Sequence, residues 1–204
     1  MKTIVYFHGI HGDTQNSVAP WLANEFQKFG YKSFYPKCFA DEQCSYSDFK
    51  KVADTLFDKG VFGDECIVIG HSVGNALFIK YCFERKLKIK AYVSLAGFCE
   101  EVPFNNPVVR ENIYAVLPND KEMNYVKNNI PFRVSLYSND HIVPEQSLIN
   151  FAKKLNAKAY FLQNKGHFGR KHGVQELPEL IDILKNEKVL SEEILFQRGT
   201  RKLL

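Results

Sequence analysis

The chain lacks the long apolar runs and the concentrated charge of one sign that membrane and nucleic-acid proteins need. No apolar run approaches the ~20 residues of a membrane-spanning helix. The opening MKTIVYF leads into a polar HGIHGD loop, without the apolar core and cleavage site of a signal peptide. The formal net charge is only +4, and both signs are mixed along the chain. We therefore expect no membrane span and no nucleic-acid partner.

Cysteine pairs are missing as well. The five cysteines are odd in number and include no CxxC spacing. Together with the missing signal peptide, this predicts a cytoplasmic protein with reduced thiols. Cys44 and Cys99 also lack any local signature of a cysteine nucleophile.

What the chain does contain is a repeating pattern of strands and helices. Its 204 residues, 45% of them hydrophobic, are enough for one sizeable core. Short β-rich apolar runs alternate with segments of helical period, which favours a parallel sheet with helices on both faces. The expected strands are 3–7, 32–35, 66–69, 91–95, 132–137 and 159–162. The expected helices are 20–29, 48–59, 73–84, 144–155 and 177–187, with Gly30 and Gly60 as left-handed caps after the first two.

Two segments depart from this pattern. Residues 100–130 contain three prolines and two Asn-Asn pairs, so we predict an irregular, cap-like excursion over one end of the sheet. Residues 189–204 are expected to form a C-terminal tail with a basic, frayed end. The prediction is a single α/β domain over residues 1–188, with a mostly parallel sheet of about six strands.

The main chemical motif is GHSVG at residues 70–74, which matches G-x-S-x-G. An aliphatic strand enters it and a helical segment leaves it, which is the setting of a nucleophile elbow. Residues bulkier than Gly70 and Gly74 would collide with neighbouring backbone. The N–H of Val73, at the helix start, would face negative charge developing at Ser72. The pattern also occurs by chance, and a tight turn alone would explain a small residue there.

A serine nucleophile needs a base, and the base needs an orienting acid, in the chain order Ser, acid, His. Asp140 follows the fifth expected strand and His167 follows the sixth. Both would therefore stand with Ser72 at the carboxyl edge of the sheet. Asp140 could instead be a turn or helix-capping residue, and His167 a plain polar loop residue. His172 is the fallback base, and His141 has no evident role.

The loop HGIHG at residues 8–12 is expected to supply a second donor to the oxyanion. Gly9 would let the backbone approach the reacting carbonyl, and the Ile10 amide is the expected donor, with Gly9 and His11 as alternatives. His8 and His11 form an H-x-x-H pair, but no third ligand is evident, so we expect no metal. The expected substrate-contacting residues are Gly9, His11, Trp21, His71 and Phe168.

Taken together, FHGIHG, PWL, GHSVGN, SNDHIVP and KGHFG resemble the small α/β-hydrolase-fold serine hydrolases of the YdeN and retinoblastoma-binding-protein type. The resemblance covers roughly residues 1–185. It implies a minimal α/β-hydrolase sheet in the order 2-1-3-4-5-6 with right-handed crossovers. It also implies Ser72 as nucleophile, Asp140 as acid and His167 as base, without metal or organic cofactor. Ile10 replaces the tryptophan often seen after His-Gly, which leaves substrate choice open.

These features predict a serine hydrolase that cleaves a carboxyl ester, thioester or amide of a small-molecule acyl substrate through an acyl-serine intermediate. Two alternatives stay open: a binding or scaffold protein of the same fold with little turnover, and an acyltransferase with an acceptor other than water. The sequence reveals neither the natural substrate nor the oligomeric state.

Overall fold

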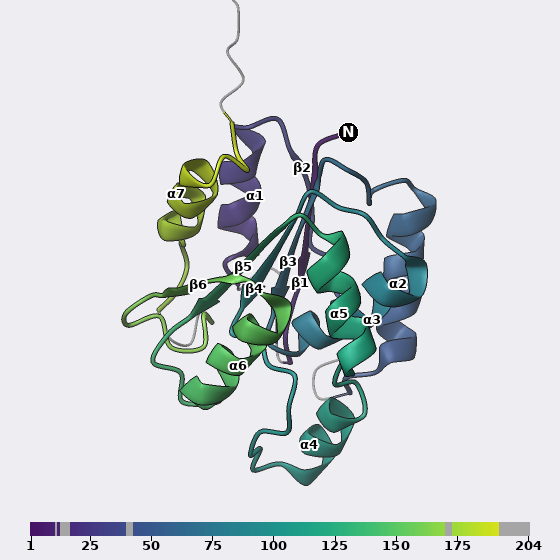
Figure 1. The fold of residues 1–204 in the computed structure, drawn as a ribbon, viewed down its shortest axis with the longest axis vertical. Coiled ribbons are helices and arrows are strands. Elements are labelled where there is room, and N and C mark those ends of the chain that lie inside the picture. Colours follow the sequence, from purple (N-terminus) through teal and green to yellow (C-terminus); the bar gives the residue numbers. More distant parts are fainter. Residues whose placement is uncertain (11, 13–16, 40–42, 170–172, 192–204) are drawn as a thin grey trace, which may run out of the picture.

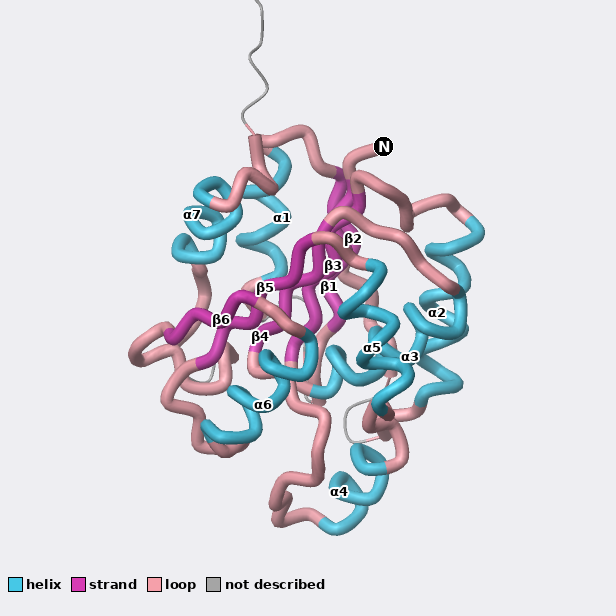
Figure 2. Tube along the Cα trace, in the orientation of Figure 1, coloured by secondary structure: helices cyan, strands magenta, loops and turns pink. Residues whose placement is uncertain are grey.

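A six-stranded parallel sheet lies at the centre of the protein in the computed structural model, which describes residues 1–10, 12, 17–39, 43–169 and 173–191 (Figures 1 and 2). The strands are β1 (Thr3–Phe7), β2 (Lys32–Phe34), β3 (Cys66–His71), β4 (Ala91–Leu95), β5 (Phe132–Tyr137) and β6 (Lys158–Phe161). Their order is β2-β1-β3-β4-β5-β6, and every neighbouring pair is parallel. The predicted fold class and strand order are confirmed.

Helices cover both faces of this sheet. They are α1 (Ala19–Gln27), α2 (Tyr46–Asp58), α3 (Val73–Arg85), α4 (Pro107–Tyr114), α5 (Asp120–Asn129), α6 (Glu145–Leu155) and α7 (Pro178–Asn186). Figure 1 shows α1 and α7 on one face and α2, α3, α5 and α6 on the other. Helix α3 is buried along most of its length because it lies between the sheet and the neighbouring α2 and α5.

The two predicted left-handed glycines are confirmed, although the helices before them end at Gln27 and Asp58, two residues and one residue earlier than expected. Gly30 has φ 78° and Gly60 has φ 66°, in the left-handed region that glycine enters without steric cost. In each case the next amide turns back to the helix: Tyr31 N–H donates to the Phe26 carbonyl at 3.2 Å. These turns redirect the chain into the following strand.

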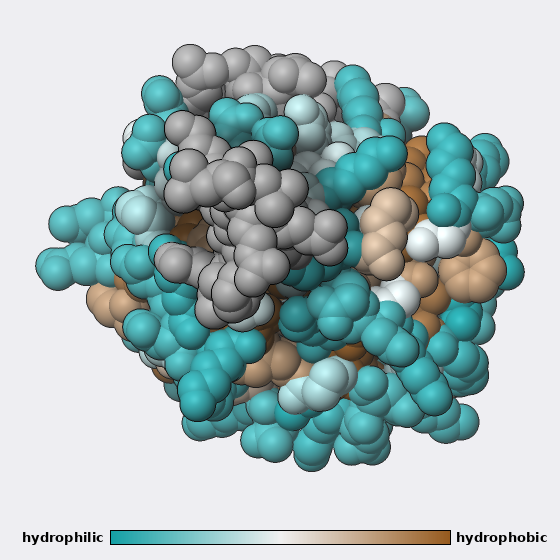
Figure 3. All heavy atoms as spheres, turned by 90° about the horizontal axis from the view of Figure 1, so that it is seen from above, coloured by the Kyte–Doolittle hydropathy of each residue, from teal (hydrophilic) through white to brown (hydrophobic). Residues whose placement is uncertain are grey.

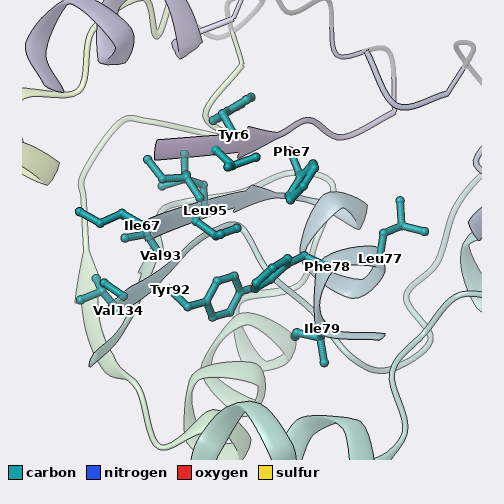
Figure 4. Close-up of a cluster of buried hydrophobic side chains, with 14 of the residues drawn as sticks. Tyr6, Phe7, Ile67, Leu77, Phe78, Ile79, Tyr92, Val93, Leu95 and Val134 are labelled. Carbon is teal, nitrogen blue, oxygen red and sulfur yellow. The ribbon is translucent and has the colours of Figure 1, made fainter. Parts of the chain in front are cut away.

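Aromatic and aliphatic side chains fill the space between the sheet and α3 (Figure 4). The rings of Phe78 and Tyr92 lie 5.2 Å apart, and those of Phe7 and Phe78 lie 5.9 Å apart. All three side chains are fully buried. Because Phe7 ends β1 and Phe78 lies on α3, this packing holds the end of β1 against α3.

The expectation of an irregular segment over residues 100–130 needs correction, because two helices form there. The Asn106 side chain accepts hydrogen bonds from the first amides of α4, and Asn119 with Glu122 forms a capping box at the start of α5. Helix α5 packs against α3 and α6 and so belongs to the helical layer. Helix α4 lies beyond the carboxyl edge of the sheet (Figure 1).

The expected tail is attached to the core where the structure describes it. Val189 and Leu190 are 6% and 3% exposed and belong to the hydrophobic core. Residues 192–204 lie outside the described residues.

Within the described part, all five cysteines are buried and free. No helix of the described residues has the length and apolar character to cross a membrane. The end opposite α4 presents a mostly hydrophilic surface with apolar patches (Figure 3).

Candidate functional site

Ser72 occupies a sharp turn between β3 and α3, with φ 53° and ψ −128°. A non-glycine residue at this φ is strained by about 1–3 kcal/mol, and such strain persists only where surrounding contacts enforce it. The serine is also the N-cap of α3, so the Val73 N–H is among the first helix amides, which have no partner within the helix. The turn has the geometry of a nucleophile elbow.

Glycines on both sides let the loop after β1 contact this turn closely. A Cβ on Gly74 would collide with the Phe7 carbonyl oxygen and lie 2.7 Å from the His8 carbonyl oxygen. A Cβ on Gly9 would lie 2.7 Å from Ser72 Cβ. The loop after β1 therefore runs in direct contact with the serine, at a distance that only glycine allows.

Asn75, which was not among the residues expected at the site, stabilises the strained turn through side-chain hydrogen bonds. Its side chain is fully buried, and Nδ2 donates to the carbonyl oxygens of Ser72 at 3.0 Å and Leu95 at 3.1 Å. Its Oδ1 accepts from the Tyr92 hydroxyl at 2.6 Å. These bonds tie the Ser72 turn to β4. The sequence does show an asparagine directly after GHSVG, but it does not show that this side chain binds Leu95 and Tyr92 of β4.

Asp140 and His167 form a hydrogen-bonded pair at the same edge of the sheet. His167 Nδ1 donates to Asp140 Oδ2 at 2.6 Å, and the two side chains are 10% and 0% exposed. The other carboxylate oxygen, Oδ1, accepts from the backbone amides of Ile142 at 2.8 Å and Val143 at 3.2 Å. Asp140 is thus both the partner of His167 and a turn residue, the two roles between which the sequence could not choose.

The charge and tautomer of this pair follow from its partners. Burial by itself would raise the pKa of Asp140, but the hydrogen bond from His167 and the two backbone amides outweigh it and hold that pKa below its usual value. Asp140 is therefore ionised near neutral pH and accepts the Nδ1 proton. In the neutral tautomer that donates from Nδ1, Nε2 is the ring nitrogen with a free lone pair, which is the arrangement that a general base requires. The hydrogen bonds of the described residues do not include one from Ser72 Oγ to His167; such bonds are often long before substrate binds.

Two more residues of the loop after β5 hold the loop that carries His167. Ser138 Oγ accepts from the Lys165 amide at 2.9 Å, and Asn139 Oδ1 accepts from the Asn164 amide at 2.9 Å. Ser138 also donates to Asn139 Oδ1 at 2.8 Å. Of this SND segment, only Asp140 was expected to take part in the site. Ser138 and Asn139 are polar residues directly after a strand, a position that could have marked them as part of the site.

His71 lies beside this pair and is buried, at 8% exposure. Its Nε2 lies 2.8 Å from the His167 carbonyl oxygen, and the two rings are 5.0 Å apart. Burial, reinforced by the nearby His167, lowers the pKa of His71 to about 3. His71 directly precedes Ser72 in the chain, so its neutral side chain links the Ser72 turn to the backbone of His167.

The loop after β1 is fixed at the Gly9 carbonyl. This oxygen accepts from the Gly12 amide at 3.0 Å and from His8 Nδ1 at 2.8 Å. His8 Nε2 accepts from the Cys38 amide at 2.9 Å, so both nitrogens of this buried ring bind backbone groups. Since the N–H and C=O of one peptide point in opposite directions, the Ile10 amide faces away from His8 and Gly12.

The other sequence candidates are spread over the structure. Phe168 is 1% exposed and packs in the hydrophobic core, so its side chain offers no surface for a ligand there. Trp21 lies on α1, partly buried against the core. His141 is exposed. His11 and His172 lie outside the described residues.

The sheet order, the strained serine turn and the His–Asp pair at the carboxyl edge define an α/β hydrolase. The family model for the serine hydrolases matches residues 60–186, more than half of the chain. The chain belongs to the serine hydrolase family. No match was found among curated proteins.

Solved structures share this fold at low sequence identity. The ydeN gene product of B. subtilis superposes with a TM-score of 0.78 at 19% identity, covering 91% of this chain and 98% of its own. A structure from work on the carboxylesterases of Nitrososphaera gargenis gives 0.64 at 13% identity, covering 91% and 89%. Est1E of Butyrivibrio proteoclasticus, with ferulic acid bound, gives 0.65 at 14% identity, covering 94% and 89%. The suspected relationship to YdeN-like hydrolases is confirmed.

Proposed function

We propose that this serine hydrolase cleaves carboxyl esters of small acyl substrates through an acyl-serine intermediate, with Ser72, His167 and Asp140 as its catalytic triad. The observation that carries the proposal is the 2.6 Å bond between His167 and Asp140, with the His167 backbone bonded to His71, the residue that precedes the strained Ser72 turn. A hydroxyl is a weak nucleophile at neutral pH, and this arrangement supplies both its base and the acid that orients the base.

In the proposed reaction, Ser72 Oγ attacks the ester carbonyl carbon while its proton passes to His167 Nε2. The resulting imidazolium is stabilised by the ionised Asp140. The tetrahedral intermediate collapses, and the leaving alcohol takes the proton from His167. Water then attacks the acyl-serine, again giving its proton to Nε2, and the acid is released with Ser72 restored.

Backbone amides would stabilise the tetrahedral oxyanion. Val73 N–H lies at the start of α3, where unpaired amides and the helix dipole favour negative charge. The Gly9 carbonyl, tied to His8 and Gly12, supports Ile10 as the second donor because it turns that amide the opposite way. Removing one such donor costs about 100- to 1,000-fold in kcat in serine hydrolases.

An ester substrate is favoured over a thioester or amide by the similar structures. The N. gargenis work concerns carboxylesterases, and Est1E holds ferulic acid. The five free, buried cysteines support a reducing compartment such as the cytoplasm. Gly9 and Trp21 are retained as proposed substrate contacts; the acyl group itself is open.

A fluorophosphonate probe tests the nucleophile directly, because it labels an activated serine without requiring the natural substrate. We expect labelling of the wild type and none of Ser72→Ala, with the modified peptide containing Ser72. Ser47→Ala, at an exposed serine of α2, is the matched control and should label like the wild type. Equal labelling of Ser72→Ala and the wild type would refute the assignment.

Turnover of p-nitrophenyl esters of increasing acyl length then separates the alternatives. A hydrolase releases p-nitrophenol from at least part of the series, and His167→Ala abolishes the release. A binding or scaffold protein would show neither release nor labelling. An acyltransferase would label, and added alcohols or amines would divert the acyl group from water in the product analysis.

A further inference from the structure

We infer that His71 is a positioning residue of the active site: its ring N–H holds the main chain of the base, His167, against the nucleophile turn. The inference rests on the proposed function, since it assigns a role at the same site. From the sequence, His71 was expected to contact the substrate. Its burial and its bond to a backbone carbonyl assign it a different task.

The direction of the bond is fixed by its acceptor. The His167 carbonyl oxygen can only accept, so His71 Nε2 carries the proton across the 2.8 Å. The bond joins residues 96 positions apart in the chain. His71 is the last residue of β3 and directly precedes Ser72. The end of β3 therefore carries the proposed nucleophile and also binds the backbone of the proposed base, His167.

The loop around His167 has a strained backbone, which needs hydrogen bonds from neighbouring residues to keep its conformation. Asn164 has φ 61° and Phe168 has φ 53°, both in the left-handed region that non-glycine residues rarely adopt, and Gly166 between them has φ 49°. A strained backbone keeps its shape only where surrounding bonds enforce it. The loop after β5 holds its first half, and Asp140 holds the His167 ring. His71 supplies the bond at the His167 main chain itself.

The anchor also stays uncharged when the base becomes charged. The titratable groups that act on His71 are His167, Asp140 and His8, and burial is the largest influence on its pKa. A second positive charge 5.0 Å from the His167 ring would oppose formation of the imidazolium. A neutral N–H donor holds the backbone without that repulsion.

Two substitutions separate the hydrogen bond from the space that the ring fills. In His71→Gln, the side-chain amide places an N–H about where Nε2 lies, whereas His71→Leu keeps an apolar side chain without a donor. Phe26→Leu, in the buried face of α1 and away from the site, controls for general loss of stability. If His71→Leu does not fold, His71→Asn replaces it, because its amide ends near Nδ1 and is too short to reach the carbonyl.

Two readouts are needed, one of which does not depend on turnover. The first is kcat and KM on the best p-nitrophenyl ester, where misplacement of the base by about 1 Å lowers kcat by up to ~100-fold. The second is the downfield NMR signal of the proton between His167 Nδ1 and Asp140. This signal reports the order of the pair even if the protein hydrolyses no ester, so failure of the proposed function does not hide the result.

We expect His71→Leu to lower kcat with little change in KM and to broaden or remove the downfield signal, while His71→Gln and Phe26→Leu retain both. A wild-type signal and wild-type kcat in His71→Leu would overturn the inference. Equal damage in His71→Gln and His71→Leu would overturn it too, because ring packing and not the donated hydrogen bond would then be what matters.

Discussion

Replacing His71 by glutamine should change how the stability of the protein responds to acid. In the unfolded chain a histidine takes up a proton near pH 6.5, whereas in the folded protein burial and the nearby His167 hold the pKa of His71 at about 3. Between these values the unfolded state binds one more proton than the folded state at this residue. Acidification therefore destabilises the wild type through His71, and glutamine removes that contribution.

The size of the effect follows from the pKa difference. One pH unit corresponds to about 1.4 kcal/mol for one proton, so at pH 4.5, two units below the unfolded value, the contribution is about 2.7 kcal/mol. Relative to the wild type, His71→Gln should gain roughly this much unfolding free energy between pH 7.5 and pH 4.5. Other titrating groups are common to both proteins and cancel in the difference.

Urea denaturation followed by circular dichroism at pH 7.5, 6.0, 5.0 and 4.5 measures this difference. Phe26→Leu serves as the control, since neither residue titrates and its difference from the wild type should be the same at every pH. If the difference between His71→Gln and the wild type also stays constant from pH 7.5 to 4.5, His71 is not held neutral by burial, and the argument for an uncharged anchor fails.

Three further substitutions test other parts of the structure. Gly74→Ala should destabilise the protein by about 1–3 kcal/mol and abolish fluorophosphonate labelling, because the added methyl collides with the Phe7 carbonyl oxygen; labelling at the wild-type rate would contradict the close approach. Asp140→Asn should cost roughly 1.5–3 kcal/mol in urea unfolding at pH 7, since a charged acceptor is lost from His167. Because the pKa of Asp140 is lowered on folding, its contribution is present above about pH 4 and is lost below it, so this deficit should shrink towards pH 3 and a constant deficit would refute the assignment. Asn119→Ala removes the cap of α5 and should lower stability by about 1 kcal/mol without changing KM; a large change in KM would instead link α5 to substrate binding.

The inner strands β1, β3 and β4 were predictable because they are buried along their whole length, on both faces, and so appear as short apolar runs. β1, β4 and β5 have the predicted bounds, and the other three differ by one or two residues at their ends. The two helices within residues 100–130 were missed because prolines and asparagines were taken as interruptions. At Asn106 and Asn119 they are helix caps, which mark where a helix begins.

The motif serine, aspartate and histidine could be found in the sequence because each follows a strand of a parallel sheet, and such strand ends meet at one edge. The supporting residues could not. Asn75 binds Leu95, and His71 binds the backbone of His167, 96 positions away. Nothing local in the sequence distinguishes a histidine that faces a substrate from one that binds a distant carbonyl, so the bond from His71 to His167 could be found only in the fold.

The three consecutive residues Ser138, Asn139 and Asp140 each hold a different point of the loop that carries His167. The length of the connection from β5 to α6 is therefore constrained. Adding or removing one residue there would move all three acceptors away from their donors at once. The connection from β4 to α5, which carries α4, makes none of these bonds in the described structure. The second connection can therefore change in length or sequence while Asp140 and His167, the proposed acid and base, keep their places.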